Sequence, residues 1–405
     1  MAGHGKFPPG SVDLGHLVLA GFLHEACPRE VVDDVLAKLD KRGKRSRLLP
    51  AWFMVYFIIA LALWRDRPQE EVLRTLRECF ALIFPDRRAP VSPTKSAIFR
   101  ARLRLGPDVM REAAKRVMKP PVFPDAPGAR YKGLRLMSLG GASFDVPDSK
   151  ENAARFGCPG SNRGGAASPR LRLLGLVENG SRAMGAGEVG PGDPGERELA
   201  SLMIDDGAFS PEMLILADEN FHGPDLWKKA DDSGAKLLWR VGSDLVLPVE
   251  KRLPDNSFLS SVHDGGEGAK RVPSKVRVID RELKGENNPN ADNVHGTITN
   301  MLDYESFPAG ELAALCRERL EPEALFAELK IVSKGSGAVI RSKVPDLVFQ
   351  DIWGLIMIHH AARRMMAREA GKVPGESGFA RAVRVTRRES PRVAAFSPGG
   401  EKADD

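Results

Sequence analysis

The sequence predicts an α/β protein in which a helical N-terminal region precedes a domain of alternating strands and helices. Residues 1–120 carry apolar residues at helical spacing. A proline-rich stretch over residues 120–127 separates them from short, strand-like runs. Among these runs, Met213–Ala217 is continuously apolar and ends at Asp218, as expected of a strand buried on both faces.

Composition bounds the class of protein. The 405 residues suggest two or three domains, and 42% apolar with 28% charged residues excludes a mostly disordered or collagen-like chain. Lys and Arg number 60 against 54 Asp and Glu, a net charge of +6 that favours polyanionic partners. The four cysteines form no C-x-x-C pair, so the sequence predicts neither a disulfide framework nor a zinc knuckle, which fits a reducing cytosol.

The N-terminal region is predicted to contain five helices. They span Val31–Leu39, Ala51–Trp64, Gln69–Phe80, Thr94–Leu105 and Asp108–Met118. The second is the most apolar stretch of the chain, but as a helix it would cover only about 21 Å of the roughly 30 Å hydrocarbon layer. We therefore expect a buried core helix and no membrane partner.

The last two of these helices flank Gly106-Pro107 and form a helix–turn–helix pattern rich in cations. These cations are Lys95, Arg100, Arg102, Arg104, Arg111, Lys115 and Arg116. One interpretation is a surface that contacts the backbone of double-stranded DNA, with Arg100 and Arg104 among the binding residues. The alternative is the solvated face of a helical bundle.

The second region reads as strands and helices in turn. Strands are predicted at Leu134–Leu139 and Ala142–Val146 (a hairpin across Gly140-Gly141), Leu171–Val177 and Arg182–Val189 (a hairpin across Asn179-Gly180), Met213–Ala217 and Lys236–Val241. Helices are predicted at Glu196–Asp206, Pro224–Asp232, Ala309–Leu329 and Val348–Ala370. Residues 242–300 indicate a β-rich insertion, and residues 371–405 a basic, then polar, poorly ordered tail.

Two carboxylates stand out as candidate ligands. Asp218 follows a buried strand, where a side chain emerges at the edge of a sheet. Glu323 follows Cys316 and Arg319 and precedes Lys330, and on a continuous helix all four lie within an arc of about 60°. A carboxylate flanked by two cations suits a Mg²⁺ ion and a phosphodiester. The alternative is an exposed helix with ordinary charges.

These residues resemble the DDE transposases of the insertion sequence 4 family, notably those of actinobacterial type. The Y-(2)-R-(3)-E-(6)-K signature of that family is matched at Arg319, Glu323 and Lys330, with Cys316 in place of the tyrosine. A typical DxxF run is present as Asp218-Glu219-Asn220-Phe221. Similar stretches also occur at Phe144–Gly157, Glu311–Glu321 and Ile340–Leu355, and the resemblance covers roughly residues 15–390.

The resemblance implies a ribonuclease-H-like core with a β-strand insertion, preceded by an N-terminal helical domain. It places the helical, DNA-binding domain at 1–120, the DDE domain at 128–370 and the insertion at about 242–300. The implied activity is binding of insertion-element ends with metal-dependent strand cleavage and strand transfer. Three carboxylates, among them Asp218 and Glu323, would hold two Mg²⁺ or Mn²⁺ ions, while Arg319 and Lys330 would contact DNA phosphates. A homodimer on paired DNA ends, in the bacterial cytoplasm at the nucleoid, is also implied.

The sequence departs from the family pattern at the first aspartate, where Gly140 stands. Asp145 is the nearby candidate to replace this catalytic carboxylate. Leu320 stands where an indole is usual, and Pro322 would cost about 3 kcal/mol inside a helix unless a helix starts there.

These departures suggest an impaired copy of the enzyme. One alternative is a DNA binder without chemistry, such as an inhibitor that occupies transposon ends. Another is a chain that does not fold stably, because Pro322 and the changes at the site undermine the core.

Overall fold

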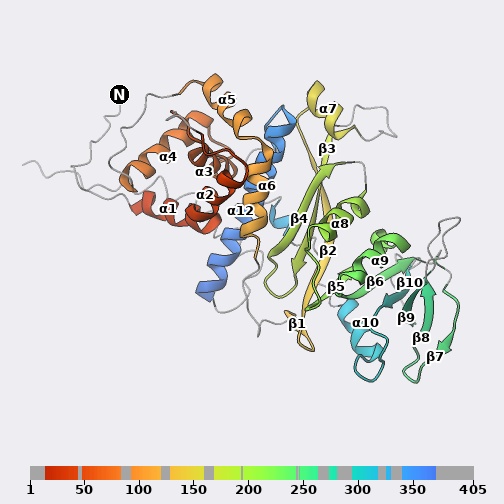
Figure 1. The fold of residues 1–405 in the computed structure, drawn as a ribbon. Helices are drawn as coiled ribbons and strands as arrows, with labels where there is room; N and C mark the ends of the chain where they lie inside the picture. The colour runs from red at the N-terminus through yellow and green to blue at the C-terminus, as the bar shows by residue number, and fades with distance from the viewer. Residues whose placement is uncertain are drawn as a thin grey trace, which may run out of the picture. The chain divides into compact units, whose positions relative to one another are not determined.

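The computed structural model describes most of the chain. The described residues are 14–43, 48–83, 93–119, 128–158, 168–192, 195–242, 245, 247–262, 273–280, 294–317, 325–329 and 340–370. By their internal packing they divide into two units (Figure 1). The first contains the residues up to Val117 and those from Glu328 onward, and the second contains Met118–Ala327.

The first unit is helical. Its helices are α1 (Leu14–Ala26), α2 (Arg29–Lys38), α3 (Ala51–Leu63), α4 (Gln69–Ile83), α5 (Lys95–Leu105), α6 (Pro107–Val117) and α12 (Pro345–Ala370). The five predicted N-terminal helices are confirmed, and α1 is additional. Every residue of α3 from Phe53 to Leu63 is buried, so this apolar segment is a core helix, as expected. Thr94 accepts a 3.2 Å hydrogen bond from the Ala97 N–H and so begins α5.

Helix α12 belongs to this helical unit, although the sequence placed residues up to 370 in the α/β domain. It packs on α1, α3 and α6 and is buried along most of its length. Gly354 permits the close crossing with α3, because a Cβ there would lie 3.2 Å from the Ile58 carbonyl oxygen. The helix is apolar on most of its circumference, so it is stable only where other helices surround it.

A charged cluster is buried in the same unit. The Glu328 carboxylate accepts a 2.9 Å hydrogen bond from Arg363 Nε and lies 2.9 Å from His359 Nε2. Each of these three residues is at most 1% exposed. Burial lowers the pKa of His359, and this effect outweighs the neighbouring carboxylate. Burial alone would raise the pKa of Glu328, but its bonds to His359 and Arg363 lower it. The native cluster therefore holds a neutral imidazole beside an ionised carboxylate.

We expect this cluster to make the protein less stable in mild acid. The unfolded chain protonates His359 near its ordinary pKa of about 6.5, whereas the folded chain resists protonation, so stability falls as pH drops below that value. For one proton, the slope of the free energy of unfolding against pH approaches about 1.4 kcal/mol per pH unit. In urea unfolding between about pH 7 and pH 5, His359→Gln should flatten the slope, whatever its effect at neutral pH. An unchanged slope would contradict the prediction.

The second unit is built on one mixed sheet. Its strands are β1 (Arg130–Tyr131), β2 (Leu134–Asp145), β3 (Arg170–Glu178), β4 (Met184–Pro191), β5 (Met213–Ala217), β6 (Lys236–Gly242), β7 (Lys251–Arg252), β8 (Phe258–Val262), β9 (Ser274–Asp280) and β10 (Val294–Thr299). The helices are α7 (Lys150–Phe156), α8 (Glu196–Asp205), the 3₁₀ turn η1 (Glu219–Phe221), α9 (Pro224–Asp232) and α10 (Ala309–Arg317). Residues 325–329 are also helical.

The strand order is β4-β3-β2-β5-β6-β10-β9-β8-β7. Strands β2, β3 and β4 form an antiparallel meander, while β5 and β6 run parallel to β2. The ribonuclease-H-like core has β2 as its central strand. Strands β3 and β4 lie on one side of it, and the parallel strands β5 and β6 lie on the other. The expected fold class is therefore confirmed. The strands of the predicted insertion extend this same sheet, because β10 pairs with β6.

One predicted hairpin is wrong and the other is confirmed. Residues 134–145 form a single strand, in which Gly140 and Gly141 pair with Gly175 and Leu174 of β3. Both glycines are extended and hydrogen-bonded within the sheet, so no turn forms. The second hairpin joins β3 to β4 around the predicted Asn179-Gly180 turn.

The sheet buries different side chains on its two faces. On one face, Leu139, Leu176 and Trp239 pack with residues of α8 and α9. On the other face, Leu216 and Leu238 pack with α10 residues, including Cys316. Because side chains alternate along a strand, each position in the sheet can be assigned to one face.

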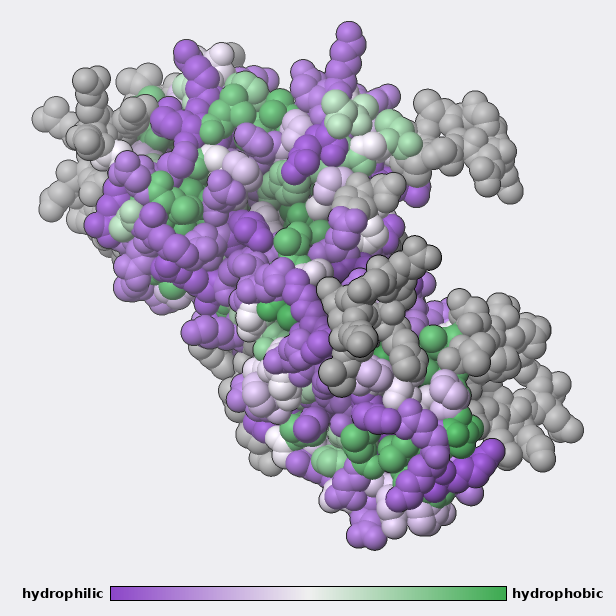
Figure 2. Space-filling model, turned by 45° about the vertical axis from the view of Figure 1, so that its right-hand side comes forward, coloured by the Kyte–Doolittle hydropathy of each residue, from purple (hydrophilic) through white to green (hydrophobic). Residues whose placement is uncertain are grey.

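Hydrophilic residues cover most of the described surface in Figure 2, with hydrophobic residues in smaller groups among them. Within the described ranges, none of the helices combines the length and the apolar character that a membrane crossing requires.

Candidate active site

The end of β5 places Asp218 in a row with two residues of the neighbouring strands. Ser138 of β2 pairs with Leu216, and Ala217 pairs with Trp239 of β6. The same registers, continued past these pairs, set Gly140 and Arg240 on either side of Asp218. In-register side chains of parallel strands point to the same face, so these three positions share one face of the sheet.

The Asp218 carboxylate is held at this edge. It is half-buried, and its Oδ1 accepts a 2.9 Å hydrogen bond from the N–H of Glu219, so that Asp218 begins η1. The turn ends the strand at the position that the sequence predicted. The apolar strand therefore carries an oriented carboxylate at its carboxyl end.

Helix α10 covers the same face and ends beside Arg240. The Arg240 guanidinium donates a 2.8 Å hydrogen bond from Nη2 to the carbonyl oxygen of Cys316. A cation at the last carbonyls of a helix is favourable, because it satisfies an acceptor and opposes the helix dipole. Thr297, which pairs with Arg240 in β10, lies 3.8 Å from the Cys316 sulfur (Oγ1 to Sγ).

A second residue, Phe326, contacts this face of the sheet on the side of Gly140 away from Asp218. Gly175 of β3 pairs with Gly140, and a Cβ at Gly175 would lie 3.6 Å from Cζ of Phe326. Phe326 therefore reaches the sheet on one side of the Gly140–Asp218 pair, and Cys316 reaches it on the other. The signature residues Arg319, Glu323 and Lys330 lie outside the described residues, as do Leu320 and Pro322.

Asp145 lies far from this row. It is five residues beyond Gly140 on the same strand, a distance of about 17 Å, and an odd offset points it to the opposite face. Its side chain is 67% exposed and forms a 2.8 Å ion pair with Arg170. The hairpin that would have folded Asp145 back toward the site is absent, so the structure does not bring it to Asp218.

The chemistry of the row suits part of a divalent-metal site. Asp218 offers the hard carboxylate oxygen that Mg²⁺ and Mn²⁺ prefer, whereas Gly140 offers no ligand and Arg240 brings a positive charge. In the described ranges, no three His, Cys, Asp or Glu residues come close enough to hold a metal ion. With Glu323 outside those ranges, Asp218 is the ligand candidate that the structure positions.

Arg240 was missed in the sequence. The signal for it is a charged residue inside the apolar strand Lys236–Gly242, where a neighbour must satisfy its guanidinium. Its partner, the Cys316 carbonyl, is distant in sequence and so could not be identified from the strand alone.

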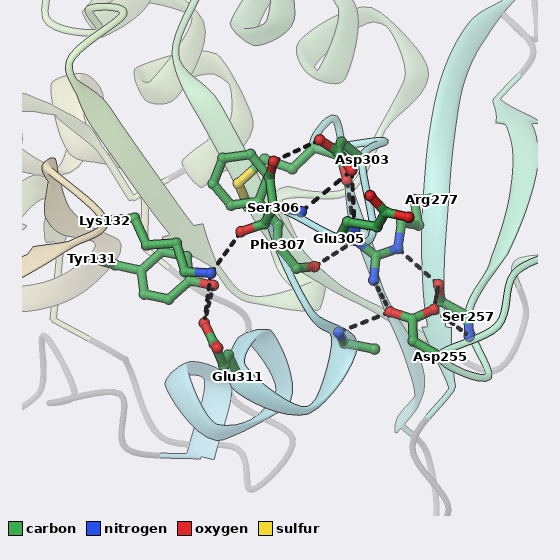
Figure 3. Close-up of polar contacts among 12 residues, drawn as sticks. Tyr131, Lys132, Asp255, Ser257, Arg277, Asp303, Glu305, Ser306, Phe307 and Glu311 are labelled. Carbon is green, nitrogen blue, oxygen red and sulfur yellow. Dashed lines mark hydrogen bonds and ion pairs between the residues drawn. The ribbon is translucent and has the colours of Figure 1, made fainter.

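A buried ion pair fixes the other end of α10 (Figure 3). Arg277 of β9 has a fully buried side chain, which pairs with Asp255 and donates 2.7 Å hydrogen bonds to the Ser257 hydroxyl and the Phe307 carbonyl. Asp255 also accepts a 2.9 Å hydrogen bond from the N–H of Ala309, the first residue of α10. Burial alone would raise the pKa of Asp255, but these hydrogen bonds and the Arg277 charge lower it. The insertion strands thereby hold the start of the helix.

A second group of contacts supports the same helix (Figure 3). The Tyr131 hydroxyl donates a 2.8 Å hydrogen bond to Glu311 Oε2, and Lys132 Nζ lies 3.0 Å from the same oxygen. Lys132 also donates to the Ser306 carbonyl at 2.6 Å. Helix α10 is thus anchored at both ends, which fixes the point where the chain enters the signature segment.

The predicted DNA-binding cations divide into exposed and buried groups. Arg100 and Arg104 are exposed on α5, as a binding role requires. Arg102 is only 2% exposed and forms a 2.6 Å ion pair with Asp351 of α12. The prediction that Arg102 lies on the cationic surface is therefore wrong. Helical periodicity directs its side chain into the core beside Ile98 and Leu105. On α6, Arg116 is paired with Glu112.

Comparisons with known proteins bear on both regions. Residues 18–113, which run from within α1 to within α6, match the family described as "Insertion element 4 transposase N-terminal". The chain is also 26% identical over 384 residues to the transposase InsG for insertion sequence element IS4 of Escherichia coli (strain K12), covering 91% of this chain and 83% of that protein.

Among solved structures, the cryo-EM structure of the piggyBac transposase synaptic complex with hairpin DNA matches with a TM-score of 0.44 and 11% identity. The match covers 94% of this chain and 82% of that one, and is too weak to bear on the assignment. The N-terminal match and the similarity to InsG along nearly its whole length show that the chain is similar to transposases of insertion sequence element IS4.

Proposed function

We propose that this protein is a transposase of actinobacterial type that binds insertion-element ends and catalyses metal-dependent cleavage and transfer of DNA strands. The observation that carries the proposal is the position of Asp218. It ends the second parallel strand of a ribonuclease-H-like core, directly beside the position where the family has its first aspartate.

The placement of α10 supports Glu323 as the partner carboxylate. Cys316 and Phe326 contact the sheet face that carries Asp218, on opposite sides of the Gly140–Asp218 pair. Glu323 lies between these two anchors in the sequence, three residues before Phe326.

Asp218 and Glu323 would hold Mg²⁺ or Mn²⁺, which lowers the pKa of bound water and stabilises a leaving oxygen. Arg319 and Lys330 would bind phosphates near the cut, and the exposed cations of α5 would bind DNA outside the site. A homodimer on paired element ends, in the cytoplasm at the nucleoid, completes the proposal. Gly140 removes one carboxylate of the three, so cleavage by this chain is expected to be slow.

The test is strand nicking of a plasmid that carries the DNA flanking the gene, with Mn²⁺ present. We expect slow nicks at the element borders, detected on end-labelled strands. Asp218→Asn keeps the size of the side chain but removes its charge, so it should abolish these nicks. Nicks that persist unchanged in Asp218→Asn would come from another nuclease and would count against the proposal.

A DNA binder without chemistry is the second candidate, favoured by Gly140, which cannot bind a metal. This candidate requires border DNA to bind without being cut, even with Mn²⁺. Binding should then survive Glu323→Gln and weaken steeply with added salt, because cations release counterions from DNA. Border nicks that depend on Asp218 would exclude it.

A further inference from the structure

Arg240 and Asp218 occupy neighbouring positions at the carboxyl ends of the parallel strands β5 and β6. The register pairs Ala217 with Trp239, and continued by one residue it sets Asp218 beside Arg240. Adjacent strands lie about 4.8 Å apart, so the two backbones are close. The hydrogen bond from Arg240 to the Cys316 carbonyl places the guanidinium on the face where α10 packs, which is also the face of Asp218.

Among the described residues, no carboxylate forms an ion pair with Arg240. Its guanidinium donates to a neutral carbonyl at 2.8 Å, which orients the side chain without cancelling its charge. A guanidinium has several N–H donors, and in the described part of the chain the buried Nε of Arg240 has no acceptor. Because the side chain is only partly exposed, salt and water screen its charge incompletely. Arg240 therefore brings a fixed positive charge to the row.

Two divalent ions side by side do not suit this row. The ions of a two-metal site lie about 3.5–4 Å apart, so they repel each other strongly. Hard carboxylate oxygens must offset this charge. Gly140 supplies no carboxylate, and Arg240 adds a further positive charge. The residues of the row therefore fit one ion at Asp218, and they do not fit two.

We propose that this chain binds one divalent ion at Asp218, where the family resemblance implies two, and that Arg240 provides the positive charge of the second ion. This inference rests on the proposed function and specifies how many metal ions the site holds. A guanidinium suits the role, because it is always charged and presents a planar set of donors to phosphate oxygens. The Cys316 carbonyl holds it in place, so little reorganisation is needed when DNA binds.

The first test counts the Mn²⁺ ions that the full chain binds on a duplex of border DNA, from the loss of the electron paramagnetic resonance signal of free Mn²⁺. The Asp218→Asn variant gives the background from the DNA and from other carboxylates. We expect one Asp218-dependent ion per chain for the parent and two for Gly140→Asp. Two such ions in the parent, or none, would overturn the inference.

The second test measures whether Arg240 repels the bound ion. Arg240→Gln removes the positive charge but keeps N–H donors, so the affinity for the Asp218-dependent Mn²⁺ should rise by about 10-fold. Arg240→Lys keeps the charge and should bind Mn²⁺ as the parent does. Arg252→Gln, the same change at an exposed position of β7, should leave the affinity unaltered. Equal affinities in Arg240→Gln and the parent would contradict the proposal.

The third test compares the rate of border nicking in two backgrounds. Arg240→Gln should slow nicking by about 100-fold in the parent, because it removes a charge that acts on the reacting phosphate. In Gly140→Asp the same change should cost much less, since a second ion is then present. Arg240→Lys should retain most of the rate in both. Equal slowing by Arg240→Gln in the two backgrounds would show that Arg240 does not replace an ion.

These outcomes also separate the inference from the proposed function. Border nicks that depend on Asp218, together with two bound ions in the parent, would overturn the inference and leave the proposed function standing. The absence of both the Asp218-dependent ion and the nicks would overturn both. Circular dichroism melts of each variant check that the fold is retained. The ion count needs no change at Arg240, so it decides the question even if Arg240→Gln does not fold.

Discussion

Gly140→Asp should raise the rate of border nicking by at least about 100-fold, because one missing charged group in such a site typically costs that much or more. Continued two residues beyond its last pair, Ser138 with Leu216, the register of β2 and β5 sets Gly140 beside Asp218 and on the same face. A carboxylate there would provide the metal ligand that the row lacks. It would also offset the positive charge of Arg240 at the other end of the row.

The backbone conformation at Gly140 permits a residue with a side chain. Gly140 lies inside the regular strand β2, opposite Gly175, and its φ is outside the left-handed region that favours glycine. At Gly141, by contrast, a Cβ would lie 2.6 Å from Glu196 Oε1, so the Glu196 side chain would have to move.

The measurement is the initial rate of nicking on end-labelled border DNA with Mn²⁺. Gly140→Asn has nearly the same shape without the charge and should remain as slow as the parent. The double variant Gly140→Asp, Asp218→Asn should lose the gain. If Gly140→Asp is as slow as the parent while it binds border DNA normally, Gly140 is not the missing ligand position.

Arg102→Met should lower the free energy of unfolding by about 3–5 kcal/mol, the usual cost of breaking a buried ion pair. The Arg102 guanidinium donates to Asp351 at 2.6 Å, to Gln350 at 3.1 Å and to the Leu347 carbonyl at 3.1 Å. Asp351 is only 11% exposed at its side chain, so the loss of Arg102 leaves a buried charge without its cation.

The same cluster holds α5 against α12. Gln350 Nε2 donates to the Arg102 and Gly106 carbonyls at 2.9 and 3.0 Å, which satisfies acceptors at the end of α5. Because Arg102 also binds Gln350, the substitution loosens this second link. The decrease in the free energy of unfolding should therefore exceed that caused by substitution of an exposed residue.

Urea unfolding followed by circular dichroism measures the effect. Arg100→Met on the exposed side of the same helix is the matched control and should change stability by no more than about 0.5 kcal/mol. The double variant Arg102→Met, Asp351→Leu removes both charges and should recover much of the loss. A loss below about 1 kcal/mol for Arg102→Met would show that the pair is not effectively buried.

Local patterns predicted the elements well. The apolar stretch of α3, the Gly106 turn between α5 and α6, and the buried strand before Asp218 all depend on residues that are neighbours in the chain. The signature around Glu323 and the glycine in the place of the first aspartate were identified from the family resemblance. The elements themselves follow from periodicity, which a sequence displays directly.

Pairing and burial were harder to predict. The Gly140-Gly141 pair has the composition of a turn, yet β3 supplies hydrogen-bond partners that keep both residues extended. Arg102 resembles the cations around it, and only its partners on α12 distinguish it. In both cases the deciding atoms belong to segments far away in the sequence.

The sequence by itself determined the types of element, the family resemblance and the two carboxylates, Asp218 and Glu323, on which the proposed chemistry depends. Only the tertiary structure decided that Gly140, Asp218 and Arg240 share a row, and that Asp145 lies off it. It also decided that α12 belongs with the N-terminal helices. The physical reason is that strand register and burial arise from non-local contacts, whereas helix and strand preferences arise from local ones.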